Sequence, residues 1–106
     1  MTKDRVRREL LNNEGSVYMV VERSSTHPVE YAYMLIALHQ GEWHTIRTFD
    51  NAHAAEEQHE HAYIRNEKQP PVTTEASVND AMVAAERKIR LEWADIVYEW
   101  KQTWHQ

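Results

Sequence analysis

The sequence predicts one small α+β domain, in which a three- to four-stranded antiparallel sheet is covered on one face by a long C-terminal helix. Three observations lead to this prediction. The chain has 106 residues, of which 42% are hydrophobic, and this suits a single compact core. Residues before position 66 contain several short segments with alternating apolar side chains. From residue 77 onward, apolar side chains instead recur every three or four positions, as they do in a helix.

The first segment, residues 2–12, is predicted to be a short helix. Val6 and Leu10 lie four positions apart, and Gly15 follows as a stop signal. The same segment carries a cluster of basic side chains, namely Lys3, Arg5, Arg7 and Arg8. This basic face would either hold an acidic partner or a short nucleic-acid strand, or simply be solvated.

Four strands are predicted next, at residues 16–23, 30–39, 43–49 and 60–65. The second of these is apolar on both faces, so it should lie in the middle of the sheet. Gly41 supplies the positive φ that a tight turn requires between the second and third strands. The adjacent residues Pro70 and Pro71 predict a loop over 66–74, because proline propagates neither helix nor sheet.

A helix is predicted over residues 77–103, with Ser77 and Asp80 as a capping box. Its apolar stripe is expected to pack on the sheet, with a cofactor-binding aromatic box as the alternative; the stripe consists of Val78, Met82, Ala85, Ile89, Trp93, Ile96 and Trp100.

A second apolar row lies on the back of this helix. Ala84, Leu91 and Tyr98 fall seven positions apart on an otherwise charged face. Such a row is typical of a partner interface, so it predicts either a homodimer or a helical protein partner.

Composition limits the environment and the chemistry. The chain has no cysteine, which excludes disulfides, thiolate catalysis and zinc-knuckle sites. The N-terminal residues have no signal-peptide pattern and no apolar run reaches membrane-spanning length. A cytoplasmic protein without membrane association is therefore expected. The net charge of −5 argues against broad binding to phosphate backbones.

The segment from Phe49 to Arg65 contains three of the seven histidines. If residues 60–65 form a strand, alternation puts four side chains on one face, namely His59, His61, Tyr63 and Arg65. Asp50 and His53 lie just upstream. Three interpretations follow: a divalent metal site, an acid–base site, or the polar exposed face of an edge strand that resists aggregation.

In the metal interpretation, His59 and His61 supply two nitrogens, and His53 or Asp50 completes the ligand set. In the acid–base interpretation, His59 and His61 cleave a phosphodiester without metal or other cofactor.

The acid–base interpretation gives each neighbouring residue a role. Arg65 would neutralise the phosphorane charge, Asp50 would orient a histidine, and Tyr63 would stack a base or donate a hydrogen bond, with His53 as a further binding residue.

The order of residues in this region resembles the TumE-like toxins of toxin–antitoxin pairs. The similarity covers an aromatic-Asp-Asn group followed by a His-x-His stretch, carried here by Arg47, Phe49, Asp50, Asn51, His53, His59 and His61. The resemblance implies a toxin that cleaves RNA or blocks translation, with an antitoxin as its protein partner. The alternative is a non-enzymatic dimeric or partner-binding module of phage or mobile-element origin.

Overall fold

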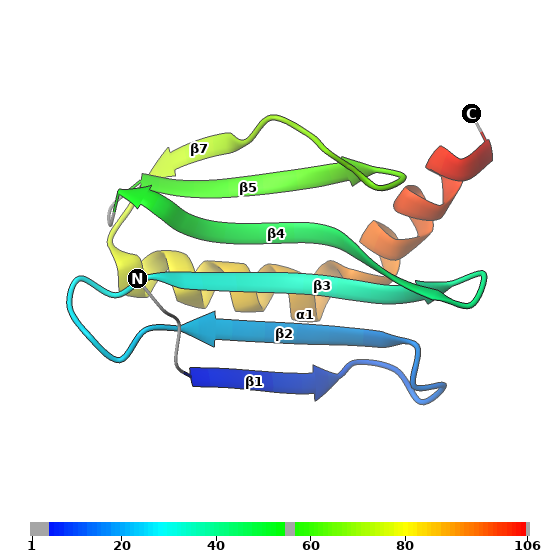
Figure 1. Ribbon diagram of the computed structural model, residues 1–106, viewed down its shortest axis with the longest axis horizontal. Helices are drawn as coiled ribbons and strands as arrows, with labels where there is room; N and C mark the ends of the chain where they lie inside the picture. Colours follow the sequence, from blue (N-terminus) through cyan, green and yellow to red (C-terminus); the bar gives the residue numbers. More distant parts are fainter. Residues whose placement is uncertain (1–4, 55–56, 106) are drawn as a thin grey trace.

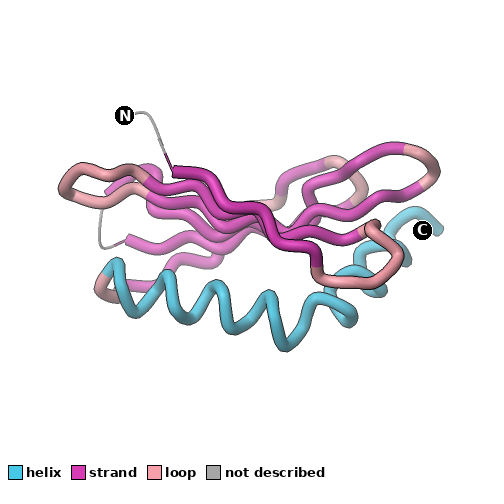
Figure 2. The backbone as a smooth tube through the Cα atoms, turned by 90° about the horizontal axis from the view of Figure 1, so that it is seen from below, coloured by secondary structure: helices cyan, strands magenta, loops and turns pink. Residues whose placement is uncertain are grey.

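The computed structural model describes residues 5–54 and 57–105, without the side chains of 52–54. It confirms the α+β class: a seven-stranded sheet lies on one long helix (Figures 1 and 2). The strands are antiparallel, and the first six follow one another across the sheet in chain order, while β7 pairs with β5. The elements are β1 (Arg5–Leu10), β2 (Val17–Arg23), β3 (Tyr31–His39), β4 (Glu42–Ala54), β5 (Glu57–Ile64), β6 (Glu67–Lys68), β7 (Val72–Glu75), α1 (Val78–Gln102) and the 3-10 helix η1 (Thr103–His105).

The predicted N-terminal helix is wrong, because residues 5–10 form strand β1. All six residues of β1 pair with β2. A helix this short is marginal in water, whereas the exposed edge of β2 satisfies the backbone hydrogen bonds of an extended segment. The four-residue spacing of Val6 and Leu10 also fits a strand, since even spacings share a face.

The sheet has more strands than predicted, and two of them are longer. β4 continues to Ala54 and β5 begins at Glu57. The predicted loop over 66–74 is wrong in part, because it contains β6 and most of β7. Pro70 and Pro71 occupy the connection between these strands, and the β-branched residues that follow them suit an edge strand.

The hydrophobic core lies between the sheet and α1. Its central strand residues include Met19, Tyr33 and Leu35, and the helix contributes Ile89 and Trp100. The predicted helical stripe is therefore confirmed as core. Ser77 is the N-cap, and its Oγ accepts a hydrogen bond of 3.1 Å from the backbone N–H of Asp80.

An ion-pair network ties β1 to α1. Arg7 contacts Glu86 at 2.5 Å, Glu86 contacts Arg90 at 3.0 Å, and Arg90 also pairs with Glu9. The hydrogen bond from Arg90 holds the pKa of Glu9 below its usual value. Partial burial raises the pKa of Glu86, but hydrogen bonds from Arg7 and Arg90 outweigh it, so the net shift is also downward.

This network should contribute to stability in a pH-dependent way. Carboxyl groups whose pKa is lower in the folded state contribute stability above their unfolded value of 4.5, and lose it as pH falls through the folded pKa. The double variant Glu9→Gln/Glu86→Gln should therefore lose less stability than the wild type as the pH falls from 5, just above the unfolded pKa, to 3, well below it. Urea unfolding across this range checks the prediction, and parallel curves for the two proteins would contradict it.

Helix α1 has 25 residues but is too polar to cross a membrane, and the described part of the chain contains no other helix that could do so.

Candidate functional site

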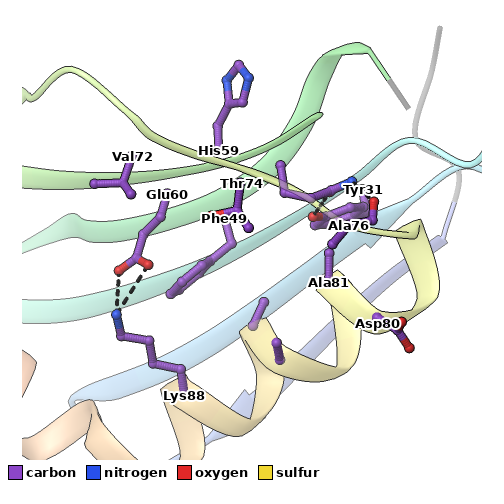
Figure 3. Close-up of a pocket in the computed structure, with 13 residues that line it drawn as sticks. Tyr31, Phe49, His59, Glu60, Val72, Thr74, Ala76, Asp80, Ala81 and Lys88 are labelled. Atoms are coloured by element: carbon purple, nitrogen blue, oxygen red, sulfur yellow. Dashed lines mark hydrogen bonds and ion pairs between the residues drawn. The ribbon is translucent and has the colours of Figure 1, made fainter. Parts of the chain in front are cut away.

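Asp50, His59 and His61 come together on the face of the sheet opposite α1. Asp50 is paired with His59 across β4 and β5, and Thr48 is paired with His61. Each paired residue shares a face with its partner. The neighbouring residue Phe49 faces the core, so Asp50 and the two histidines point the other way; Figure 3 shows the ring of His59 directed away from α1.

The three side chains are close enough to act together. One donor atom from each lies within 4.8 Å of the other two, and the ring centroids of His59 and His61 are 6.2 Å apart. His59 is only 6% exposed, while Asp50 and His61 are half-buried. His59 is not on an edge strand, because Asp50 of β4 pairs with it on one side and Thr73 of β7 on the other. The edge-strand interpretation is therefore wrong for His59.

Each histidine is oriented by an acceptor from its own neighbourhood. The Nε2 atom of His59 lies 2.9 Å from Oε1 of Glu57, and Nδ1 of His61 lies 2.8 Å from the backbone carbonyl of Gln69. A carbonyl or carboxylate oxygen only accepts, so these two ring nitrogens are the ones that carry a proton. In the neutral imidazole the other ring nitrogen then bears a lone pair.

Glu57 and Gln69 were not predicted from the sequence. The spacing of Glu57 and His59 places them on one face of a strand and could have revealed their contact. No sequence signal indicates the contact of His61 with Gln69, which depends on how the chain turns back after β5.

The predicted row of four side chains ends at His61. Arg65 follows the last residue of β5 and has φ +53°, which breaks the alternation. Its Nε donates to the carbonyl of Thr103 at 3.3 Å, and its guanidinium lies 5.8 Å from the ring centroid of Trp104. This position beside the C-terminal end of α1 lies away from the histidine pair, so the geometric prediction for Arg65 is wrong.

Two further predicted residues stand outside the cluster. Tyr63 is half-buried and packs against the hydrophobic core. The side chain of His53, which was also the third histidine of the predicted metal set, lies outside the described residues.

The remaining residues of the family resemblance have structural contacts. Asn51 is 1% exposed, and its side chain accepts from the N–H of Tyr31 and donates to the carbonyl of Val29, both at 2.9 Å. It thus fixes the end of the 24–30 loop beside Asp50. Arg47 contacts Glu60 at 2.6 Å on the helix-facing side of the sheet.

A cavity of about 320 Å³ lies on that helix-facing side, between β5, β7 and α1 (Figure 3). Its lining is mainly apolar, including Phe49, Val72 and Ala81. Its charged pair is Lys88 and Glu60, which contact each other at 2.9 Å. His59 is among the residues that line this cavity, but its ring points away from α1, toward the opposite face of the sheet.

A second pair of histidines sits in an aromatic cluster at the other end of the sheet. The ring centroids of His44 and Trp100 are 5.1 Å apart, and those of His39 and Trp100 are 5.3 Å apart. The Nδ1 of His44 lies 2.6 Å from Oδ1 of Asn66. Among the described residues, this pair has no carboxylate close enough to form a ligand cluster.

The predicted partner row on α1 is at the surface. Leu91 is 72% exposed, Tyr98 is 66% exposed, and Ala84 is also exposed. Whether a partner covers this row stays a prediction.

Comparisons with protein-family models, with curated proteins and with solved structures find no match for this chain.

Proposed function

We propose that this chain is a toxin-like small protein that acts on RNA in the cytoplasm, with Asp50, His59 and His61 as its reactive centre. The observation that carries the proposal is that one donor atom from each of these three side chains lies within 4.8 Å of the other two, on the sheet face opposite α1. The resemblance to TumE-like toxins, which includes all three residues, supplies the substrate class.

The reaction we propose is transfer of the phosphoryl group to the neighbouring 2′-oxygen. Nε2 of His61 takes the proton of the ribose 2′-hydroxyl, because Nδ1 of this ring is held by the carbonyl of Gln69. The 2′-oxygen then bonds to phosphorus as the bond to the 5′-oxygen breaks. Protonated His59 gives the leaving oxygen its proton. The products are a 2′,3′-cyclic phosphate and a 5′-hydroxyl.

The carboxylate of Asp50 supports this chemistry by holding the two imidazoles in position. It lies opposite His59 in the strand register and within reach of both rings. In place of Arg65, protonated His59 would offset the charge that develops on phosphorus. The net charge of −5 favours a short single-stranded segment over a long duplex, which requires many phosphate contacts.

The test is cleavage of a short single-stranded RNA by the purified chain in EDTA. Products ending in a 2′,3′-cyclic phosphate are expected, and replacing the ribose at the cleaved position by deoxyribose should stop the reaction. An RNA that stays intact, or that is cut equally at deoxyribose positions, would overturn the proposed function.

A second candidate function is a non-enzymatic module that binds a second copy of the chain or another protein. It is supported by the exposure of Leu91 and Tyr98 in one row on α1. Large apolar side chains in a row on a surface helix are typical of helix–helix interfaces.

This candidate predicts that Leu91→Glu weakens self-association. A buried, unpaired carboxylate at an interface costs several kcal/mol, so a roughly tenfold or larger rise in the dimer dissociation constant is expected. Val83→Glu is the matched control, because Val83 is also exposed but lies off the row. Sedimentation equilibrium measures both variants. A wild-type chain that stays monomeric at high concentration would remove the homodimer.

A further inference from the structure

The geometry points to a second property of the Asp50–His59–His61 cluster: it is a three-ligand site for a divalent first-row transition ion. Two imidazoles and one carboxylate are a ligand set that zinc, iron and their neighbours accept. The hard ions Mg²⁺ and Ca²⁺ prefer oxygen ligands throughout, so two nitrogen donors disfavour them. The inference concerns binding alone and does not require the proposed action on RNA.

The strand register already brings the ligands close to binding distance. Asp50 and His59 are direct neighbours across β4 and β5, and His61 follows two positions later on the same face. The donor atoms lie within 4.8 Å of one another. Bonds of about 2.1 Å to a tetrahedral ion place its ligands roughly 3.4 Å apart. Small side-chain rotations would close this difference, and Asp50 and His61 are half-exposed and have room to make them.

The tautomers of the two histidines also suit coordination. The contacts with Glu57 and with the carbonyl of Gln69 hold a proton on one nitrogen of each ring. In each neutral ring the lone pair is then on the other nitrogen, and the neutral imidazole is the form of histidine that binds a metal. Metal-ligating histidines in proteins usually donate their second N–H to a carboxylate or a backbone carbonyl. Here Glu57 and Gln69 supply one acceptor of each kind.

Three protein ligands leave further coordination positions for water or another small ligand, as in exchangeable metal sites. One consequence rests on the proposed function. An ion bound to Nε2 of His61 would occupy the lone pair that takes the 2′-hydroxyl proton. Zinc binding and RNA cleavage would then exclude each other.

The test is calorimetric titration of the full chain with Zn²⁺, supported by the visible spectrum of the Co²⁺ form. We expect one ion per chain in the wild type, and an affinity at least tenfold lower in Asp50→Asn and in His61→Gln. His105→Ala removes an exposed histidine of η1, outside the cluster, and should bind Zn²⁺ like the wild type. Circular dichroism shows whether each variant is folded.

Absence of Zn²⁺ binding by the wild type would overturn the inference, as would equal binding by the folded Asp50→Asn and His61→Gln variants. The RNA assay in EDTA separates this outcome from failure of the proposed function. Cleavage without zinc binding would reject the metal site alone, and zinc binding without cleavage would reject the action on RNA alone.

Discussion

His61→Ala should lower the rate of RNA cleavage by about 10²–10⁴-fold, the usual contribution of a positioned general base. The methyl group of alanine cannot take the 2′-hydroxyl proton, and the carbonyl of Gln69 would lose its partner. Since His61 is half-exposed, removal of its ring should leave the core intact. The loss should therefore appear in the rate of cleavage and leave the unfolding curve nearly unchanged.

His105→Ala is the matched control for this experiment, because it also removes one imidazole and lies in η1, far along the chain from β5. Single-turnover cleavage of a labelled RNA compares the two variants with the wild type. The acid–base assignment would be wrong if His61→Ala cut RNA as fast as His105→Ala.

Ile89→Ala should lower the free energy of unfolding by about 2–5 kcal/mol, the range for removing a buried aliphatic side chain and leaving a cavity. Ile89 is 0% exposed and lies on the face of α1 that packs on the sheet. Because α1 provides one of the two layers of the core, a cavity there weakens the packing of the whole domain.

Leu91→Ala is the control, since Leu91 is 72% exposed two positions away on the same helix. Its effect on the monomer should stay within about 0.5 kcal/mol. Urea unfolding at dilute protein concentration measures both. Similar midpoints for the two variants would show that the helix does not pack through the face that contains Ile89.

The long helix and the central strands were predictable because their periodicities are long and unbroken. The stripe that contains Ile89 and Trp100 has one face to bury, and it is buried as predicted. Residues 5–10 were not predictable in this way, since Val6 and Leu10 suit either structure. Their conformation is decided by the unpaired edge of β2, which is information from the rest of the fold.

The site was predicted in part, because strand alternation can be read from the sequence but strand pairing cannot. Alternation along β5 correctly put His59 and His61 on one face. The pairing of Asp50 with His59 depends on the register between β4 and β5, which the sequence does not specify. The place of Arg65 could not be predicted, because a single residue with positive φ redirects its side chain. The contact of His61 with Gln69 becomes visible only once the chain has turned back after β5, whereas the contact of Glu57 with His59 could have been inferred from their spacing on one strand.

Nitrogen NMR of the histidine side chains can show whether Asp50, His59 and His61 form one centre. We expect neutral His61 to carry its proton on Nδ1, where the carbonyl of Gln69 accepts it. We also expect Asp50→Asn to shift the ring signals of both His59 and His61 while those of His105 stay in place. A proton on Nε2 of neutral His61, or ring signals that do not respond to Asp50→Asn, would contradict this expectation and show that the three side chains do not form one centre.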